Sequence, residues 1–300
     1  MAQVTIHARP GRLRRPVLLL AFAGWNDAAE SATNAARFLR SAWDGQRIAS
    51  LDPEEFYHFG LQRPLVRLVP GSLEREIVWP ETEFTLCTRA SRDVVVGVAI
   101  EPHLRWKTYC RAVLDFAREL EVGLVVTLGA LLAEVPHTRP VRLSGFATDP
   151  ELGALLGVRP TRYEGPTGIV GVLSSTARAT GFATASLWAN VPHYISAMEN
   201  PRATLALVQR VNRLFDGPLD AHELEEAATQ FDAQLTEVLK QNRKVATYVR
   251  RLEAKDQEAE EAEPPPAGDL PSSHDLVAEI ERFLRQQPPG PSGPPPPDSE

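Results

Sequence analysis

The sequence predicts an α/β protein with a largely parallel or mixed central sheet. Continuous apolar runs such as Val17–Phe22 and Leu124–Leu128 are typical of strands that are covered on both faces. Amphipathic segments such as Trp106–Leu120 alternate with these runs, which is the pattern of βα units. The Pro70-Gly71 turn between two short apolar stretches adds an antiparallel hairpin.

The first half of the chain contains most of the predicted strands. After Val17–Phe22, Asn26 or Asp27 is placed to cap a helix that continues to Ala42, because a short side-chain oxygen accepts the unpaired amides of a helix start. The other strands predicted in this half are Arg47–Leu51, Leu65–Val69, Glu74–Trp79, Phe84–Thr88 and Val94–Ile100.

The second half alternates helices with two buried strands. Its predicted elements are the helix Trp106–Leu120, the strand Leu124–Leu128, the helix Pro150–Leu156, a helix that ends near Ala179, the strand Thr184–Trp188 and a helix from Asn200 to Phe215. The Gly217-Pro218 break then closes an α/β core domain at residues 1–217.

The C-terminal region has a different pattern. Residues 218–257 are predicted to form one long helix, because apolar residues recur at three-four spacing from Leu224 to Leu252, with Asn242 at one core position. This stripe fits either packing on another helix or packing on its own domain. An acidic, proline-rich linker at 258–271, an amphipathic helix at 272–286 and a disordered proline-rich tail at 287–300 complete the prediction.

Charge and cysteine content narrow the class of protein. The net charge is −7, and residues 253–300 alone carry −9, which leaves a nearly neutral body. A nucleic-acid binder would show a basic face, so no nucleic-acid partner is expected. No run reaches the length of a membrane span, and the two cysteines, Cys87 and Cys110, lack metal-type spacing. A cytoplasmic protein without membrane partner, cofactor or metal is predicted.

One short phrase occurs twice and marks the best candidate site. Residues 133–137 read Ala-Glu-Val-Pro-His and residues 189–193 read Ala-Asn-Val-Pro-His, each after a predicted buried strand. Working residues of open α/β sheets gather past the carboxyl ends of strands. Glu134, His137, Asn190 and His193 are therefore candidates for one polar pocket. The alternative is that each histidine binds a carbonyl and stiffens a proline turn.

Further candidates follow other strands. Trp25, Asn26 and Asp27 form the first βα turn, where a helix start could bind an anion, or where they only cap the helix. Glu101 and His103 follow another strand; Glu101 could serve as a general base or complement a helix dipole. The segment 165–171 is glycine-rich but lacks the Lys-Ser/Thr pair of a P-loop. A nucleophile elbow, a paired zinc site and a His-Glu-x-x-His motif are all absent from the sequence.

These phrases together resemble one family. They are Gly24-Trp25-Asn26-Asp27-Ala28, Leu128-Gly129-Ala130 with Val135-Pro136-His137-Thr138-Arg139-Pro140, Gly165-Pro166-Thr167-Gly168-Ile169, and Ser186-Leu187-Trp188-Ala189 with Val191-Pro192-His193-Tyr194. In this order they are similar to the proteasome assembly chaperone 2 family, and in particular to its actinobacterial members. The resemblance covers about residues 16–252 and provides no catalytic residue to carry over.

The resemblance implies a three-layer α/β/α fold like that of nucleoside phosphorylases and hydrolases. It also implies a cytoplasmic protein that self-associates into a homo-oligomer, for instance a trimer, and that binds proteasome subunits or another multisubunit complex. Some relatives dock through a C-terminal hydrophobic-Tyr-any tail, whereas this sequence ends Pro297-Asp298-Ser299-Glu300. The amphipathic segment around Leu276–Leu284 is the only comparable docking segment expected in this sequence.

Two functions therefore compete. The first is a non-catalytic assembly factor, favoured by the resemblance and by the absence of standard catalytic motifs. The second is a nucleoside phosphorylase-like or hydrolase-like enzyme, suggested by the polar strand ends and the implied fold. They differ in one structural respect: an enzyme needs Glu101, Glu134, His137, Asn190 and His193 to line one open pocket.

Overall fold

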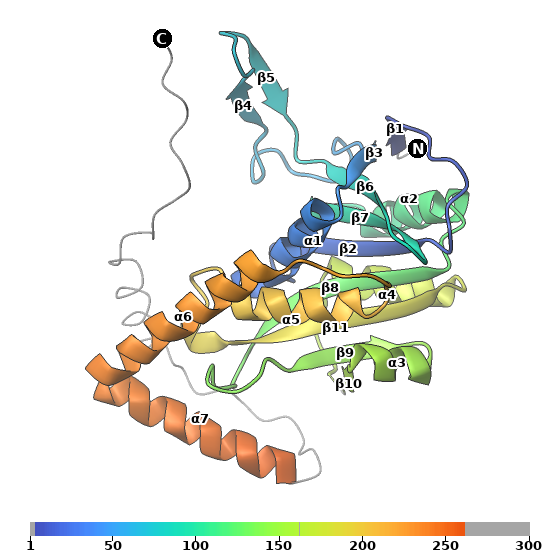
Figure 1. The fold of residues 1–300 in the computed structure, drawn as a ribbon. Helices are drawn as coiled ribbons and strands as arrows, with labels where there is room; N and C mark the ends of the chain where they lie inside the picture. The colour runs from blue at the N-terminus through green and yellow to red at the C-terminus, as the bar shows by residue number, and fades with distance from the viewer. Residues whose placement is uncertain (1–3, 162, 262–300) are drawn as a thin grey trace.

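The computed structural model describes residues 4–161 and 163–261, and a nine-stranded sheet forms its centre (Figure 1). The order of strands is β1-β3-β6-β7-β2-β8-β11-β9-β10. The strands are β1 Val4–Ile6, β2 Val17–Ala23, β3 Gln46–Leu51, β6 Thr82–Thr88, β7 Asp93–Ile100, β8 Leu124–Ala133, β9 Leu143–Ala147, β10 Arg159–Pro160 and β11 Ala183–Pro192. The four central strands are parallel and the flanking pairs are mostly antiparallel, which confirms the predicted mixed sheet.

Helices cover both faces of this sheet. The helices α1 (Ser31–Ala42) and α5 (Pro201–Asn212) pack on one face, and α2 (Trp106–Glu119) and α4 (Ile169–Ala179) pack on the other. Strand β2 shows why its run is apolar throughout: alternate residues enter the two separate core clusters. The short helix α3 (Pro150–Leu156) contacts β9 near the edge.

A hairpin stands apart from the main sheet. Strands β4 (Leu65–Leu68) and β5 (Arg75–Val78) pair only with each other, in antiparallel register, and project from the body (Figure 1). The Pro70-Gly71 signal predicted this hairpin. Because β3 and the central strands run in the same direction, the hairpin leaves the sheet at the edge where those strands end.

Two helices follow the core where the sequence predicts one. Helix α6 (His222–Gln241) and helix α7 (Arg243–Glu261) meet at Asn242, whose backbone is extended (φ −124°, ψ 98°). Its side-chain Oδ1 accepts hydrogen bonds from the amides of Lys244 and Val245, at 3.1 and 3.2 Å. Asn242 therefore caps α7 instead of filling a core position, and the prediction of one helix over 218–257 is wrong.

These two helices, here called the helical elbow, pack on their own chain. A third core cluster joins Tyr194 and Ile195, just past β11, to Phe231, Leu235 and Val238 of α6; its other members are Val245, Val249 and Leu252 of α7. Of the two alternatives for the apolar stripe, the structure shows packing on its own domain. Helix α7 also extends to Glu261, so residues 258–261 are helical and not linker. The helix predicted at 272–286 and the tail at 287–300 lie outside the described residues.

Some boundaries differ from the prediction. Strands β8 and β11 each continue for four or five residues beyond the expected ends. The strands β1, β9 and β10 lack a clear sequence signal and were not expected. Within the described part of the chain, none of the helices has the length and apolar character that crossing a membrane requires.

Candidate functional site

The two copies of the repeated phrase lie on neighbouring strands. Strands β8 and β11 are parallel and pair Ala133 with Pro192. The first copy begins at the last residue of β8 and continues into a loop, whereas most of the second copy is inside β11. The phrases therefore lie side by side but are shifted along the strands relative to each other, and their histidines occupy different environments.

His193 joins the two phrases to the helical elbow. Its Nδ1 lies 3.1 Å from the carbonyl oxygen of Ala133, the first residue of the other phrase. Its Nε2 lies 2.9 Å from the hydroxyl of Tyr248 on α7. Both ring nitrogens are thus occupied by internal partners.

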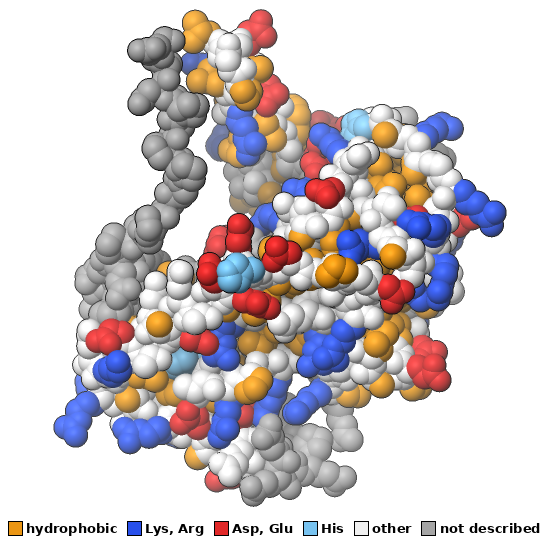
Figure 2. Space-filling model, viewed as in Figure 1, with side chains coloured by type: hydrophobic (Ala, Val, Ile, Leu, Met, Phe, Trp, Pro, Cys, Tyr) orange, Lys and Arg blue, Asp and Glu red, His pale blue; other side chains and the backbone are white. Residues whose placement is uncertain are grey.

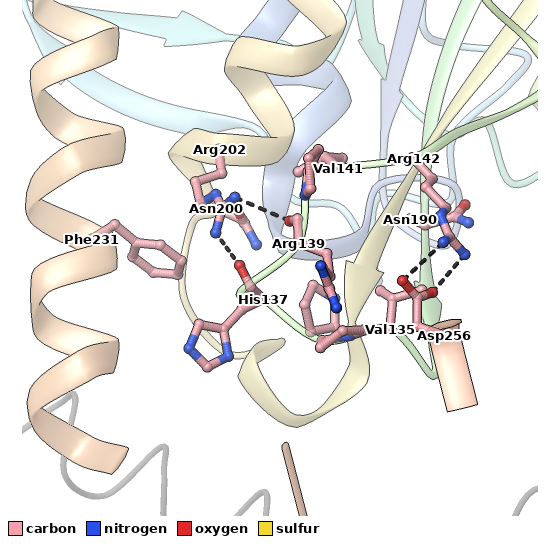
Figure 3. Close-up of a pocket in the computed structure, with 13 residues that line it drawn as sticks. Val135, His137, Arg139, Val141, Arg142, Asn190, Asn200, Arg202, Phe231 and Asp256 are labelled. Carbon is pink, nitrogen blue, oxygen red and sulfur yellow. Dashed lines mark hydrogen bonds and ion pairs between the residues drawn. The ribbon is translucent and has the colours of Figure 1, made fainter. Parts of the chain in front are cut away.

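His137 is buried against Tyr194. The Tyr194 hydroxyl accepts the His137 amide hydrogen at 2.8 Å and lies 2.7 Å from His137 Nδ1. Arg202 of α5 donates to the His137 carbonyl (Figure 3). Burial lowers the pKa of His137 to about 4, with a further contribution from the Arg202 cation. The imidazole is therefore neutral at physiological pH, and burial also raises the pKa of Tyr194.

The other two residues of the phrases bind locally. The Glu134 carboxylate pairs with Lys255 of α7. The side-chain oxygen of Asn190 accepts a hydrogen bond from the Ser144 hydroxyl at 3.1 Å, and its backbone N–H donates to the Arg142 carbonyl at 3.1 Å. Each polar side chain of the repeated phrase is thus engaged within the chain.

Helix α7 makes further polar contacts with the same region. Asp256 pairs with Arg142 through both carboxylate oxygens, at 2.5 and 2.8 Å, and is 7% exposed. Glu253 accepts a hydrogen bond from Thr138 at 2.5 Å. Together with Lys255 and Tyr248, these residues fasten the elbow over the ends of β8 and β11.

A small cavity remains under the elbow. Its volume is about 20 Å³, which is room for about one water molecule (Figure 3). Arg202 points across it to the carbonyls of His137 and Arg139 and also pairs with Asp232 of α6, at 3.0 Å. Larger hollows of about 430 and 450 Å³ lie elsewhere, beside the end of α2 and beside α3.

Asn26 and Glu101 form a second, separate group. The Asn26 amide donates to Glu101 Oε1 at 2.7 Å, and the same oxygen accepts the Ile169 amide at 2.8 Å, at the start of α4. A Cβ at Gly168 would lie only 2.2 Å from Asn26 Oδ1 and 2.6 Å from Glu101 Oε1, so a side chain there would displace this pair. The Glu101 carboxylate therefore occupies the place at the α4 start where an external anion would bind.

The remaining predicted residues do not enlarge either group. Asp27 caps α1 by accepting from the Ala32 amide at 2.6 Å and from the Thr33 hydroxyl at 2.5 Å, and burial raises its pKa. Trp25 is exposed, and His103, also exposed, accepts the His58 amide at 3.1 Å. Among the described residues, no hydrogen bond or ion pair joins Glu101 to either histidine of the phrases.

Several residues of this region were not predicted from the sequence. Tyr194 directly follows His193, so its position offered a signal. Arg142, Arg202 and Asp256 offered none, because they lie far apart in the sequence, in the loop before β9, in α5 and in α7. Within the part of the chain that the structure describes, no three His, Cys, Asp or Glu side chains are grouped to hold a metal ion.

A comparison with models of protein families shows the family to which the chain belongs. The model of the PAC2 family matches residues 21–239. The chain belongs to the PAC2 family. The resemblance to proteasome assembly chaperones of actinobacteria is confirmed by this match and by solved structures of PAC2 relatives.

Two such relatives are bacterial. A PAC2 family protein from Streptomyces avermitilis is 43% identical, with a TM-score of 0.72, and the match covers 78% of this chain and 99% of that one. A proteasome-assembly chaperone homologue from Mycobacterium tuberculosis is 39% identical, with a TM-score of 0.70 and the same coverage.

A third structure with a similar fold is archaeal. The proteasome activator PbaB from Pyrococcus furiosus is 17% identical, with a TM-score of 0.62, and the match covers 79% of this chain and 98% of that one. At this identity the likeness concerns the fold alone. No curated protein is similar enough to this PAC2 chain to count as a match.

Proposed function

We propose that this PAC2 protein is a non-catalytic assembly factor that binds subunits of a proteasome or of another multisubunit complex. One observation carries the proposal: the polar residues at the ends of β8 and β11 fasten the helical elbow, and the cavity that remains has room for only about one water molecule. The Mycobacterium tuberculosis relative, described as a proteasome-assembly chaperone homologue, supplies the class of partner.

The proposal also covers the location, the self-association and the fold type expected from the sequence. The protein acts in the cytoplasm, self-associates into a homo-oligomer such as a trimer, and uses a nucleoside phosphorylase-like arrangement of layers as a scaffold. The nearly neutral body and the exposed apolar hairpin support contacts with proteins over contacts with nucleic acid.

The enzyme alternative has less support. At the start of α4, where backbone amides could bind a phosphate-containing ligand, Glu101 already accepts the Ile169 amide. A histidine general base would need a free ring nitrogen, yet both ring nitrogens of His193 are engaged, by Ala133 and Tyr248. Nδ1 of His137 is engaged by Tyr194. These internal contacts favour the binding function.

The proposal is tested by capture from the native host. The tagged full chain is purified from lysate, and its partners are quantified by mass spectrometry against a tag-only control. We expect enrichment of proteasome α-type subunits or of subunits of one other complex. A parallel experiment uses a chain ending at Glu261. If neither form enriches any subunit above the control, the proposal is wrong.

A further inference from the structure

An open groove lies at one edge of the sheet, between the helix α3 and the strands β9 and β10. Its volume is about 450 Å³, whereas one water molecule takes roughly 30 Å³, so the groove has room for several side chains. Its lining is mostly apolar and includes Phe146, Ala147, Gly153, Ala154, Val158 and Pro160. In Figure 2, orange side chains gather at the place where Figure 1 shows α3.

The groove is open because the residues that face each other across it are small. A Cβ at Gly153 would lie 3.6 Å from the Cβ of Ala147, so neither residue fills the space between α3 and β9. On the same helix, Leu155 is 46% exposed. An apolar surface of this kind is a place where another segment can bind.

Helix α7 brings the C-terminal part of the chain to this edge. Asp256 of α7 pairs with Arg142, which directly precedes β9. From there, five residues of strand lead to Ala147 in the groove, which is roughly 17 Å. The linker 262–271 follows α7 directly and spans up to about 35 Å when extended. The segment 272–286 can therefore reach the groove.

This segment has the pattern of a helix that needs a surface on which to pack. In a helical conformation, its large apolar side chains share one face; they are Leu276, Ile280, Phe283 and Leu284. A helix of this length is marginal in water by itself. A short tether holds it near the groove at an effective concentration in roughly the mM range. This favours the segment of the same chain over a second copy in dilute solution.

Charge favours the same pairing. Four arginines border the groove, against two acids at the start of α3. The guanidinium of Arg178 lies 5.9 Å from the centre of the Phe146 ring, and the arginines of α5 donate to the last carbonyls of α3. The four are Arg159, Arg178, Arg210 and Arg213. Residues 262–286 contain five acids and two bases, so their net charge of −3 is opposite to that of the groove.

We propose that the segment 272–286 packs as a helix in the groove of its own chain, with its apolar face toward Phe146 and Ala154. In this docked form its apolar side chains are covered, so a partner that binds the segment must first displace it. The inference goes beyond the proposed function. It concerns the purified protein alone, so the capture experiment does not decide it.

The first test follows hydrogen exchange of the α3 amides in the purified full chain. L276E/F283E places two carboxylates on the apolar face of the segment, so the segment should leave the groove and these amides should exchange about three- to tenfold faster. The control H274E/A278E adds the same two carboxylates on the opposite face and should exchange like the wild type. Both variants leave residues 4–261 unchanged, and circular dichroism and the Tm establish that they are folded.

The second test measures which surface the segment contacts. In E151C/A278C, a short thiol cross-linker should join α3 to the segment within one chain, at a mass near 33.0 kDa. L73C/A278C is the matched control, because Leu73 is 94% exposed in the β4–β5 hairpin, which projects away from α3 (Figure 1). It should give no such product. The native Cys87 and Cys110 are buried and should not react.

A third variant changes the groove itself. Ala154→Glu places a carboxylate opposite the acidic segment, and in the E151C/A278C background it should remove most of the cross-linked product. Equal exchange of α3 in the wild type and in L276E/F283E would overturn the inference, as would equal cross-linking of the segment to positions 73 and 151. A product with the mass of two chains would identify a second copy as the occupant, and the inference would be wrong.

Discussion

At the scale of single residues, Tyr194 holds the strand ends together through its hydroxyl. That oxygen bonds both the amide and Nδ1 of His137 inside the core. Tyr194→Phe leaves the His137 amide without this acceptor, and we expect the free energy of unfolding to fall by about 1–3 kcal/mol. Urea denaturation measures the change. Tyr163→Phe, on an exposed loop, is the matched control and should cost less than about 0.5 kcal/mol.

His137 also makes stability depend on pH. The pKa of His137 is about 4 in the folded protein, against an ordinary value of 6.5 for histidine, so between these pH values the unfolded chain binds a proton that the folded chain does not. The contribution of a neutral His137 to the free energy of unfolding is complete above pH 6.5 and is lost as the pH falls toward 4. From pH 7.5 to 5.5 we expect a loss of about 1 kcal/mol from this residue.

The measurement is urea denaturation at both pH values, for the wild type and for His137→Gln. Glutamine does not titrate, so the variant should lose this part of the pH dependence while the other histidines keep theirs. An identical pH dependence in the two proteins would contradict the assigned pKa.

At the scale of elements, one ion pair holds α7 more strongly than the other. Asp256 is buried and binds Arg142 through two oxygens, whereas Lys255 is exposed where it meets Glu134. Asp256→Ala should therefore destabilise the protein by about 2 kcal/mol. Lys255→Ala should change it by less than about 1 kcal/mol. Hydrogen exchange of the α7 amides should rise in the first variant; equal effects from both would contradict this ranking.

The strands show how far the sequence could predict the fold. Strand β2 was predictable because both of its faces are buried, so every residue is apolar. Strand β8 was underestimated because it contains Gly129, where a Cβ would lie 2.6 Å from the Trp188 ring. Strands β1 and β10 have only three and two residues, which is too short for any periodicity.

The candidate site was predicted in part, for a physical reason. The repeated phrase correctly indicated that two strand ends lie side by side. The sequence could not show that the ring of His193 reaches Ala133, because this contact depends on the register between β8 and β11. Asn242 was assigned to a core position because it falls within the three-four spacing of the apolar residues. Spacing alone does not distinguish a residue of the helix core from a residue that caps the next helix.

At the scale of the whole molecule, the elbow is part of the core. Tyr194 and Ile195 belong to the same cluster as the apolar side chains of α6 and α7. A chain ending at Gly217 lacks the α6 and α7 members of this cluster, so it should expose Tyr194 and Ile195, bind hydrophobic dyes and lose cooperative thermal unfolding. A chain ending at Glu261 should unfold cooperatively. A cooperative transition in the shorter chain would show that residues 1–217 fold as a domain by themselves.

The helical elbow follows the strand ends that it covers at a long distance along the chain, and this distance sets an order of events during synthesis. Strand β11 ends at Pro192, but the carboxylate that clasps Arg142 belongs to Asp256, about 60 residues later. At 5–20 residues per second, a ribosome needs roughly 3–12 seconds to make that interval. Until α6 and then α7 are made, Tyr194 and Ile195 lack their apolar cover, so this interval is when a holding chaperone would protect the chain most.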